Sequence, residues 1–247
     1  MRNFFLGDNQ VSGDSVTVTG ELYRHMARVL RLKAGSEVGL TEEGGRLLQG
    51  VIEEVGAKSL TVRITREEQP REEEAGVRIT LYQGMPKGEK LDLILQKCTE
   101  LGIARIVAFE GERSVVKLSG ERSASRLERC QKIVQEAARQ SGRLSPPAVS
   151  LGGSLDKVLK GADQSVKLLL WEDEHRNGLR AALQAHAQPP ESVAIVVGPE
   201  GGLTAEEVAR AVESGFTPVT LGRRILRTET AGLAILSILQ FHWGDIG

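Results

Sequence analysis

The sequence of 247 residues has few aromatic residues and few of the side chains that bind metals or form disulfides. Aromatic residues make up 4% of the chain, and there are two cysteines, Cys98 and Cys130, and four histidines. Both cysteines lie in segments with a helical pattern, which favours free buried thiols in a reducing compartment over a disulfide framework. The histidines and cysteines lack metal-ligand spacing, so we expect no metal site.

Long apolar runs are also missing. The longest uninterrupted apolar segments, such as 193–197, are far shorter than the roughly 18 residues that a membrane-spanning helix needs. Residues 1–8 have one basic residue and an apolar stretch of three, which does not match a secretory signal. With 40% hydrophobic and 26% charged residues, the composition predicts a soluble, cytoplasmic protein of one large or two modest domains.

The charge of the chain is close to zero but unevenly distributed. A formal net charge of −1 lacks the basic signature of a general nucleic-acid binder. Residues 1–75 carry 10 basic and 13 acidic side chains, residues 76–147 carry 13 and 8, and residues 148–247 carry 9 and 12. The positive charge is therefore concentrated in the middle of the chain, between two acidic ends.

The first seventy residues show hydrophobic alternation with a period of two. Examples are Val16 with Val18 and the set Leu47, Val51 and Val55, which we assign to one buried strand face. One helical interruption is expected at 21–30. The pattern predicts a small antiparallel β-barrel or sandwich.

An acidic segment with little apolar content, 66–76, is expected to link this domain to the rest of the chain. The predicted domains are therefore 1–72 and 73–247. Beyond the linker, strands are predicted at 77–81, 105–109, 166–171, 193–197 and 217–221, and helices at 89–101, 122–140, 155–159, 179–185, 205–214 and 229–243. Their alternation predicts an α/β fold with a mostly parallel sheet and helices on both faces.

A glycine-rich segment, GPEGGLT at 198–204, follows one of the predicted strands. Thr204 can cap the next helix, and Glu207 completes a capping box. Glycines at the carboxyl end of a parallel strand let a ligand approach the backbone closely. The segment is neither the dinucleotide fingerprint nor a P-loop, and a tight turn without a ligand is an equal alternative.

A second segment, LGRRILRTETA at 221–231, also follows a strand and leads into a helix. It offers apolar contacts and three arginines. In the alternative interpretation, Arg223 and Arg224 are solvated, Ile225 and Leu226 fill the core, and Thr228 caps the helix. Because both segments lie at the same end of a parallel sheet, we expect them to line one crevice.

The predicted helix that begins at residue 122 carries a basic stripe. At about 100° per residue, its cations fall within an arc of roughly 140° beside an apolar arc. They are Arg122, Arg126, Arg129, Lys132, Arg139 and Arg143, and the nearby Arg113 and Lys117 extend the patch. We favour a surface for the phosphate backbone of RNA over a merely solvated face.

Taken together, the two segments resemble the signature loops of the SPOUT class of S-adenosylmethionine-dependent RNA methyltransferases. Within that class the chain is most similar to the bacterial 16S rRNA (uracil-N3)-methyltransferase family. Residues 24–31 resemble that family's PUA-like RNA-binding barrel, and residues 87–102 resemble the first helix of its catalytic domain. The resemblance implies a SPOUT-type, mostly parallel sheet with a deep trefoil knot, preceded by a PUA-like β-barrel domain. It also implies a homodimer and, as substrate, small-subunit ribosomal RNA, either free or in the assembled 30S subunit.

The resemblance and the chemistry of uracil together suggest roles for particular residues. Methylation at N3 requires loss of a proton and stabilisation of negative charge, so we assign Glu200 as proton acceptor or substrate-positioning group and Arg227 as the stabilising cation. S-adenosylmethionine is expected to contact Leu170, Gly198, Gly201, Leu221, Gly222, Ile225, Leu226 and Ala231. RNA is expected to contact Arg28, Arg31, Lys87, Arg113, Arg122, Arg126 and Arg129.

Two other functions fit the sequence. One is a SPOUT enzyme that modifies a ribose 2′-OH or a guanine. The other is a ribosome-assembly protein that binds RNA without catalysis and has no affinity for S-adenosylmethionine.

Overall fold

The computed structural model describes residues 2–7, 9, 11–42, 46–68, 76–115 and 122–246. Contacts group the chain into two compact units, 1–74 with 138–146, and 75–137 with 147–247. The expected linker at 66–76 falls mostly on positions outside the described residues, as do Lys117 and the side chain of Arg122. Within the described part of the chain, no helix is long and apolar enough to cross a membrane.

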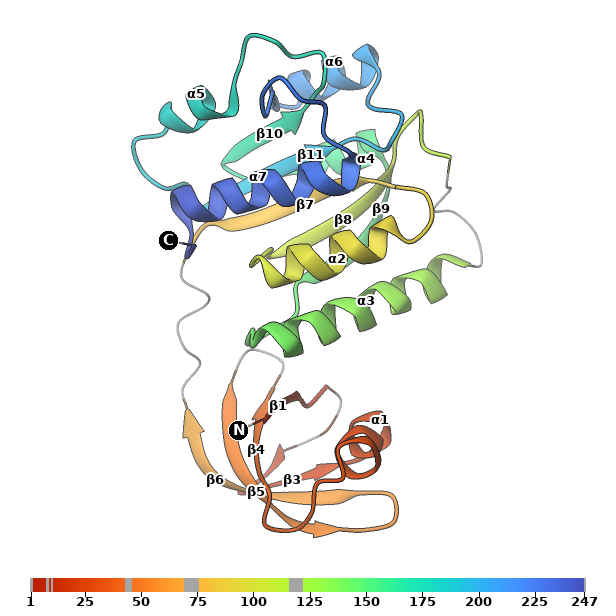
Figure 1. Cartoon of the computed structure of the whole chain (residues 1–247), viewed down its shortest axis with the longest axis vertical. Coiled ribbons are helices and arrows are strands. Elements are labelled where there is room, and N and C mark those ends of the chain that lie inside the picture. Colours follow the sequence, from red (N-terminus) through yellow and green to blue (C-terminus); the bar gives the residue numbers. More distant parts are fainter. Residues whose placement is uncertain are drawn as a thin grey trace. The chain divides into compact units, whose positions relative to one another are not determined.

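The first unit contains a six-stranded sheet (Figure 1). Its elements are β1 (Arg2–Phe5), β2 (Val11–Ser12), β3 (Ser15–Val18), α1 (Gly20–Tyr23), the π-helix η1 (Arg24–Val29), β4 (Glu37–Thr41), β5 (Leu47–Val55) and β6 (Leu60–Glu68). The strand order is β1-β4-β5-β6-β3-β2. Strand β1 pairs with β4 in parallel, and the other pairs are antiparallel. The predicted β unit with one helical interruption is therefore observed, and most of that interruption is π-helical.

The buried face of β5 differs from the prediction. Leu48 and Ile52 are fully buried, whereas Val55 is exposed. The pairing of β5 with β6 is irregular between Gln49 and Gly50 and again after Ile52. Such bulges change which side chains face the core, so a strict period of two predicted Leu47, which is buried, but failed at Val55.

The second unit is built on a six-stranded, entirely parallel sheet with the strand order β12-β10-β11-β7-β8-β9 (Figure 1). The strands are β7 (Arg78–Gly84), β8 (Arg105–Glu110), β9 (Ala148–Ser154), β10 (Val166–Leu170), β11 (Ser192–Val197) and β12 (Thr217–Val219). The helices are α2 (Lys90–Glu100), α3 (Arg122–Ser141), α4 (Leu155–Lys160), α5 (Leu179–Gln184), α6 (Ala205–Glu213) and α7 (Thr228–Trp243).

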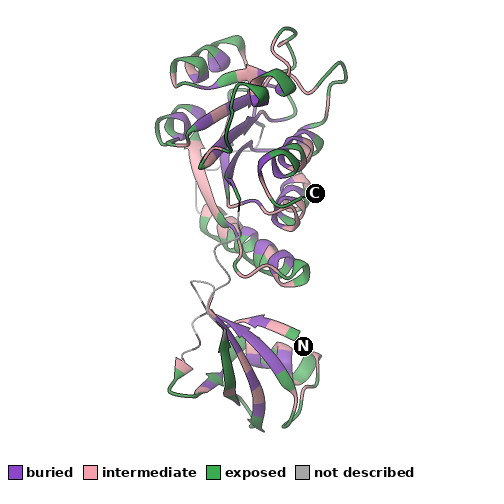
Figure 2. Ribbon diagram, turned by 90° about the vertical axis from the view of Figure 1, so that its left-hand side faces the viewer, coloured by how far each residue is buried: buried purple, intermediate pink, exposed green. Residues whose placement is uncertain are grey.

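Helices cover both faces of this sheet, as predicted. Along β11, Val193 and Ile195 join a core cluster that includes side chains of α2, α3, α5 and α7. The alternate residues Ala194 and Val196 join a second cluster with α4 and α6. Figure 2 shows the buried strands between the two helical layers. Both faces of the sheet are thus removed from water, which explains the near-continuous apolar runs of its central strands.

The sequence pattern does not predict strand β9, because two glycines, Gly152 and Gly153, interrupt its apolar residues near the end of the strand. A Cβ atom at Gly152 would lie 2.5 Å from Val158 Cγ2 and 2.7 Å from Val107 Cγ1, so close packing requires glycine there. Gly153 has φ +79°, a conformation that disfavours other residues. With β9 in place, strands and helices alternate without a break from β7 to α7.

Candidate active site

A pocket of about 670 Å³ lies at the carboxyl ends of β10, β11 and β12, which are neighbours in the sheet. The two loops singled out in the sequence, 198–204 and 221–227, both line it. Of the residues assigned to cofactor binding or catalysis, nine line the pocket: Leu170, Gly198, Glu200, Leu221, Gly222, Ile225, Leu226, Arg227 and Ala231. The structure therefore brings together residues that are up to 61 positions apart in the sequence.

Gly201 does not line the pocket but packs against the loop that follows β8. Its carbonyl oxygen accepts a hydrogen bond of 2.9 Å from Arg113 Nη1. A Cβ atom at Gly201 would lie 2.9 Å from Arg113 Cβ, which is too close. Arg113, assigned to RNA binding from the sequence, thus helps to hold the first loop.

A third loop, not recognised from the sequence, completes the pocket wall. Trp171, Glu172, Asp173 and His175 follow β10 and line the pocket. Trp171 Nε1 is buried and has no hydrogen-bond partner among the described residues. The rule that ligands bind beyond the carboxyl ends of parallel strands could have identified this loop, because it directly follows a predicted buried strand.

The predicted capping box at the start of α6 is confirmed. The Glu207 backbone N–H donates to Thr204 Oγ1 over 3.1 Å, and the Thr204 N–H donates to Glu207 Oε2 over 2.9 Å. The other oxygen of this buried carboxylate accepts from the Glu112 N–H at 2.8 Å. Glu207 therefore joins the loop after β8 to the end of the glycine-rich loop.

Thr228 does not cap α7, contrary to one interpretation of the sequence. Arg227 occupies the N-cap position. The Thr228 hydroxyl instead donates to the Gly198 carbonyl oxygen at 2.6 Å and accepts from Gln83 Nε2 at 2.8 Å. Gln83 is fully buried at the end of β7, so these bonds connect both pocket loops to the central strand.

The end of β7 also approaches the first loop directly. A Cβ atom at Gly84 would lie 2.4 Å from the Pro199 backbone nitrogen, so only glycine fits at this position. The contact of Gly84 with Pro199 and the hydrogen bonds of Thr228 hold the pocket wall in place. Neither group is chemically reactive.

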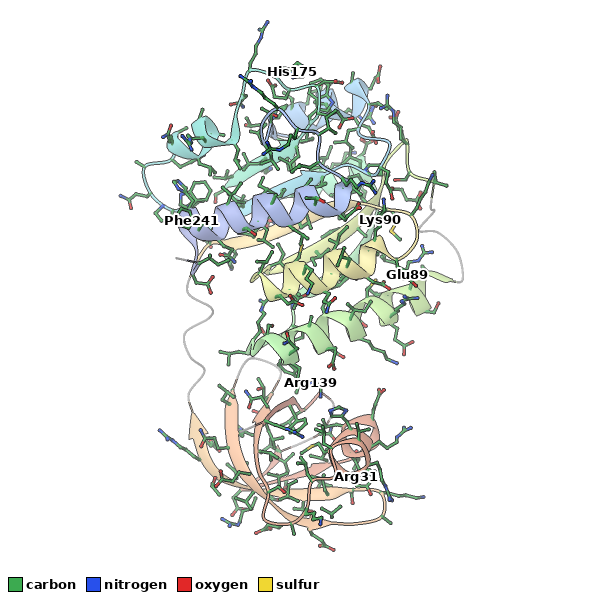
Figure 3. All side chains as sticks on the ribbon, viewed as in Figure 1. Arg31, Glu89, Lys90, Arg139, His175 and Phe241 are labelled. Atoms are coloured by element: carbon green, nitrogen blue, oxygen red, sulfur yellow. The ribbon has the colours of Figure 1, made fainter. Side chains whose placement is uncertain are left out.

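The Glu200 carboxylate is held by two groups near the start of α2. Its Oε1 accepts from the Lys87 backbone N–H at 3.0 Å and lies 3.0 Å from Lys90 Nζ. Burial tends to raise the pKa of Glu200, but the Lys87 N–H and the Lys90 ammonium outweigh it, so the pKa is lowered. A carboxylate so stabilised is a weaker base, which favours the positioning role over the proton-acceptor role. Figure 3 labels Lys90 at the start of α2.

The three arginines of the second loop are exposed. No side-chain hydrogen bond or ion pair links Arg223, Arg224 or Arg227 to a residue that the structure describes. Ile225 is 83% exposed, so it does not fill the core, whereas Leu226 packs against it. The loop therefore presents cationic and apolar groups to the pocket at the same time.

The basic stripe lies along α3, with Arg143 just past the end of the helix. Its apolar arc is buried as predicted at Cys130, Val134 and Ala137. Arg129 forms an ion pair with Asp92 of α2, and Lys132 lies 3.2 Å from Glu128. Part of the stripe is thus neutralised, in one case by a residue on a different helix that the sequence pattern could not reveal.

In the first unit, Arg28 and Arg31 are exposed. Arg31 has φ +53°, an uncommon conformation for a residue with a side chain. Arg28 lies in η1, and π-helical turns are frequent at functional sites. These features are compatible with the RNA contact assigned to both residues.

Cys98 and Cys130 are free and buried. Burial raises the pKa of the Cys98 thiol to about 12 and also raises that of Cys130. Both thiols are therefore poor nucleophiles. Among the described residues, no group of three or more histidine, cysteine or acidic side chains is arranged to hold a metal ion.

Comparison with known proteins identifies the class of enzyme. A family model described as the RNA methyltransferase domain matches residues 73–240, and one described as the RNA methyltransferase PUA domain matches residues 18–65. Ribosomal RNA small subunit methyltransferase E of Bacillus subtilis is 34% identical over 233 residues, which cover 92% of this chain and 90% of that protein.

Two solved structures are similar over nearly the whole chain. Ribosomal RNA small subunit methyltransferase E of Neisseria gonorrhoeae, bound to S-adenosylmethionine, has a TM-score of 0.87 and 34% identity and covers 99% of both chains. A methyltransferase structure from Legionella pneumophila with bound S-adenosylmethionine has a TM-score of 0.85 and 31% identity and covers 97% of this chain and 96% of that one. This chain belongs to the RNA methyltransferase family whose catalytic domain follows a PUA domain, as its sequence motifs had indicated.

Proposed function

We propose that the protein transfers the methyl group of S-adenosylmethionine to N3 of one uridine in small-subunit (16S) ribosomal RNA. The observation that carries this proposal is the pocket at the carboxyl edge of the parallel sheet, formed by two loops that were predicted to bind this cofactor. Its volume of about 670 Å³ lies within the range of roughly 300–1,000 Å³ that is usual for small-molecule sites.

The residues present suit S-adenosylmethionine. Gly198 and Gly222 expose backbone groups, and Leu170, Leu226 and Ala231 provide an apolar wall. The unpaired Trp171 Nε1 is a donor available to a bound molecule. When bound, the cofactor supplies an electrophilic methyl group, and the protein has to position uracil against it and stabilise the charge that develops.

We assign that stabilisation to Arg227. Uracil becomes negatively charged when N3 gives up its proton to solvent water, and a nearby guanidinium can donate hydrogen bonds to the uracil oxygens. Arg227 lines the pocket at the N-terminus of α7, and its side chain has no competing partner among the described residues. The partial positive charge of this helix end acts in the same direction. Glu200 is kept ionised by the Lys87 N–H and the Lys90 ammonium, and we assign it to positioning the substrate in the pocket.

RNA is held, in this proposal, by cationic side chains from both units of the chain. We propose contacts from Arg28 and Arg31 in the PUA domain, from Lys87 and Arg113 beside the pocket, and from Arg122, Arg126 and Arg129 on α3. Contacts of this kind orient RNA through its phosphates and leave the choice of base to the pocket. The substrate is either the free RNA or the assembled 30S subunit, which places the protein in the cytoplasm.

A homodimer is part of the same proposal. Helix α7 is apolar on almost every side, yet Phe241 is 72% exposed and Ile238 is 40% exposed. A second copy that packs on this face would cover both side chains.

We also propose that the chain near 221–230 threads through an earlier loop as a trefoil knot. In the sequence, the boundary between the two domains is proposed to fall after residue 72.

The test is transfer of labelled methyl from S-adenosylmethionine to small ribosomal subunits that lack the modification, followed by mapping of the modified nucleoside. We expect 3-methyluridine at a single position. Label in a ribose or a guanine would point to a different RNA target, and absence of both transfer and cofactor binding would point to an RNA-binding assembly protein.

A further inference from the structure

Lys90 occupies a place that local helix electrostatics disfavour. It is the first residue of α2, where the partial positive charge of the helix end repels a cation. The side chain is nevertheless held in a defined position at the edge of the pocket and contributes to its lining. A cation at a helix N-terminus, where the helix dipole disfavours it, is most easily explained by the neighbouring groups that it binds.

Two carboxylates, one from a loop and one from a helix, converge on the Lys90 ammonium. Nζ lies 3.0 Å from Glu200 Oε1 and 3.5 Å from Glu229 Oε2. Glu200 belongs to the glycine-rich loop that lines the pocket and Glu229 to the first turn of α7, so one cation joins this loop to the start of α7. The carboxylate side chains are 26% and 16% exposed, and neither can be fully hydrated in this position.

Each of the two carboxylates is connected to Arg227 by its place in the chain or in the pocket. Glu229 follows Arg227 by only two residues, and Glu200 and Arg227 line the same pocket. Without Lys90, a half-buried carboxylate would need another cation, and Arg227 is the cation nearest to Glu229 along the chain. An Arg227 side chain paired with Glu229 could not donate its hydrogen bonds to a substrate.

We propose that Lys90 is a positioning residue for methyl transfer, which binds Glu200 and Glu229 and thereby keeps Arg227 free to face the uracil. This inference rests on the proposed function. Lys90 acts through its two partners and does not itself contact the reacting atoms.

The test compares variants in the full-length protein, with small ribosomal subunits as substrate. For Lys90→Met we expect kcat to fall by about 100-fold, the effect of misplacing a catalytic group, with little change in the Kd of S-adenosylmethionine. Lys90→Arg keeps the charge and should retain most of the activity. Lys97→Met is the matched control, because Lys97 lies on the same helix and pairs with Glu100 at 2.8 Å, away from the pocket lining.

A second-site variant separates this role from simple bracing. In Lys90→Met/Glu229→Gln the carboxylate two residues from Arg227 is gone, while Glu200 keeps its bond from the Lys87 N–H, so Arg227 is released and kcat should recover most of its loss. If Lys90 merely braced the loops, the double variant would be as slow as Lys90→Met or slower, and the proposal would be wrong. Normal turnover by Lys90→Met would also overturn it.

Failure of the proposed function and failure of the role of Lys90 give different experimental results. A wild-type protein that transfers no methyl group overturns the proposed function and, with it, the role of Lys90. An active wild type whose Lys90 variants behave like Lys97→Met overturns the role of Lys90 alone.

Discussion

The substitution Thr228→Val tests whether the pocket is held together by the buried hydrogen bonds that run from Gln83 through Thr228 to Gly198. Valine has nearly the shape of threonine but cannot donate or accept a hydrogen bond. The change removes the bonds of 2.6 Å to the Gly198 carbonyl and 2.8 Å from Gln83 Nε2. The Gln83 amide keeps its other bond, to the Gly84 carbonyl at 3.0 Å.

The expected cost follows from burial. Thr228 is 7% exposed and Gln83 is fully buried, so water cannot easily replace the lost hydroxyl. Each buried group that loses its partner costs about 1–3 kcal/mol, which suggests about 3 kcal/mol for the two together. In a domain of roughly 150–250 residues, that corresponds to a Tm lower by about 6–12 °C. Because Gly198 lines the pocket, affinity for S-adenosylmethionine should fall as well.

Thr228→Ser is the matched control, since it keeps the hydroxyl and removes a methyl group worth about 1 kcal/mol. Thermal unfolding and calorimetric titration with S-adenosylmethionine should rank the proteins as wild type, then serine, then valine. A valine variant at least as stable as the serine variant, with unchanged cofactor affinity, would refute the structural role of these hydrogen bonds.

Three further predictions concern charge. Arg227→Ala should abolish methyl transfer while calorimetry finds the cofactor Kd nearly unchanged; normal turnover would exclude the role assigned to Arg227. Charge reversal at Arg126 and Arg129 should weaken RNA binding and flatten its salt dependence by about 0.7–0.9 in logarithmic slope per lost phosphate contact, and an unchanged slope would count against this surface. The lowered pKa of Glu200 means that its contacts stabilise the fold fully above the unfolded-state pKa of about 4.3 and lose this effect as the pH falls through the lower folded-state value. Acid titration of unfolding should therefore show less loss of stability below pH 4.3 for Glu200→Gln than for the wild type.

The fold could largely be predicted from the sequence wherever a single hydrophobic pattern dominates. The central strands read as apolar runs because both of their faces are buried, and the capping box of Thr204 and Glu207 is a local feature with a local signature. Strand β9 and the full inward face of β5 could not be predicted from the sequence, because glycine packing and bulges depend on neighbouring strands.

Part of the site could also be predicted from the sequence, because it follows from the same strand pattern. Both pocket loops could be located because they follow strands of one parallel sheet, and their spacing supplied the family resemblance. Two ion pairs join elements that are far apart in the sequence, Arg129 with Asp92 and Lys90 with Glu229. No local sequence pattern predicts such pairs. Thr228 looked like a helix cap, and only the position of Gly198 shows where its hydroxyl donates.

The reaction proposed for this pocket is transfer of a methyl group from S-adenosylmethionine to N3 of a single uridine of small-subunit ribosomal RNA. It is tested most directly by incubating the wild-type protein with labelled S-adenosylmethionine and unmodified small subunits and then identifying the labelled nucleoside by mass spectrometry. We expect one 3-methyluridine per subunit. Label in any other nucleoside, or no label despite bound cofactor, would contradict it.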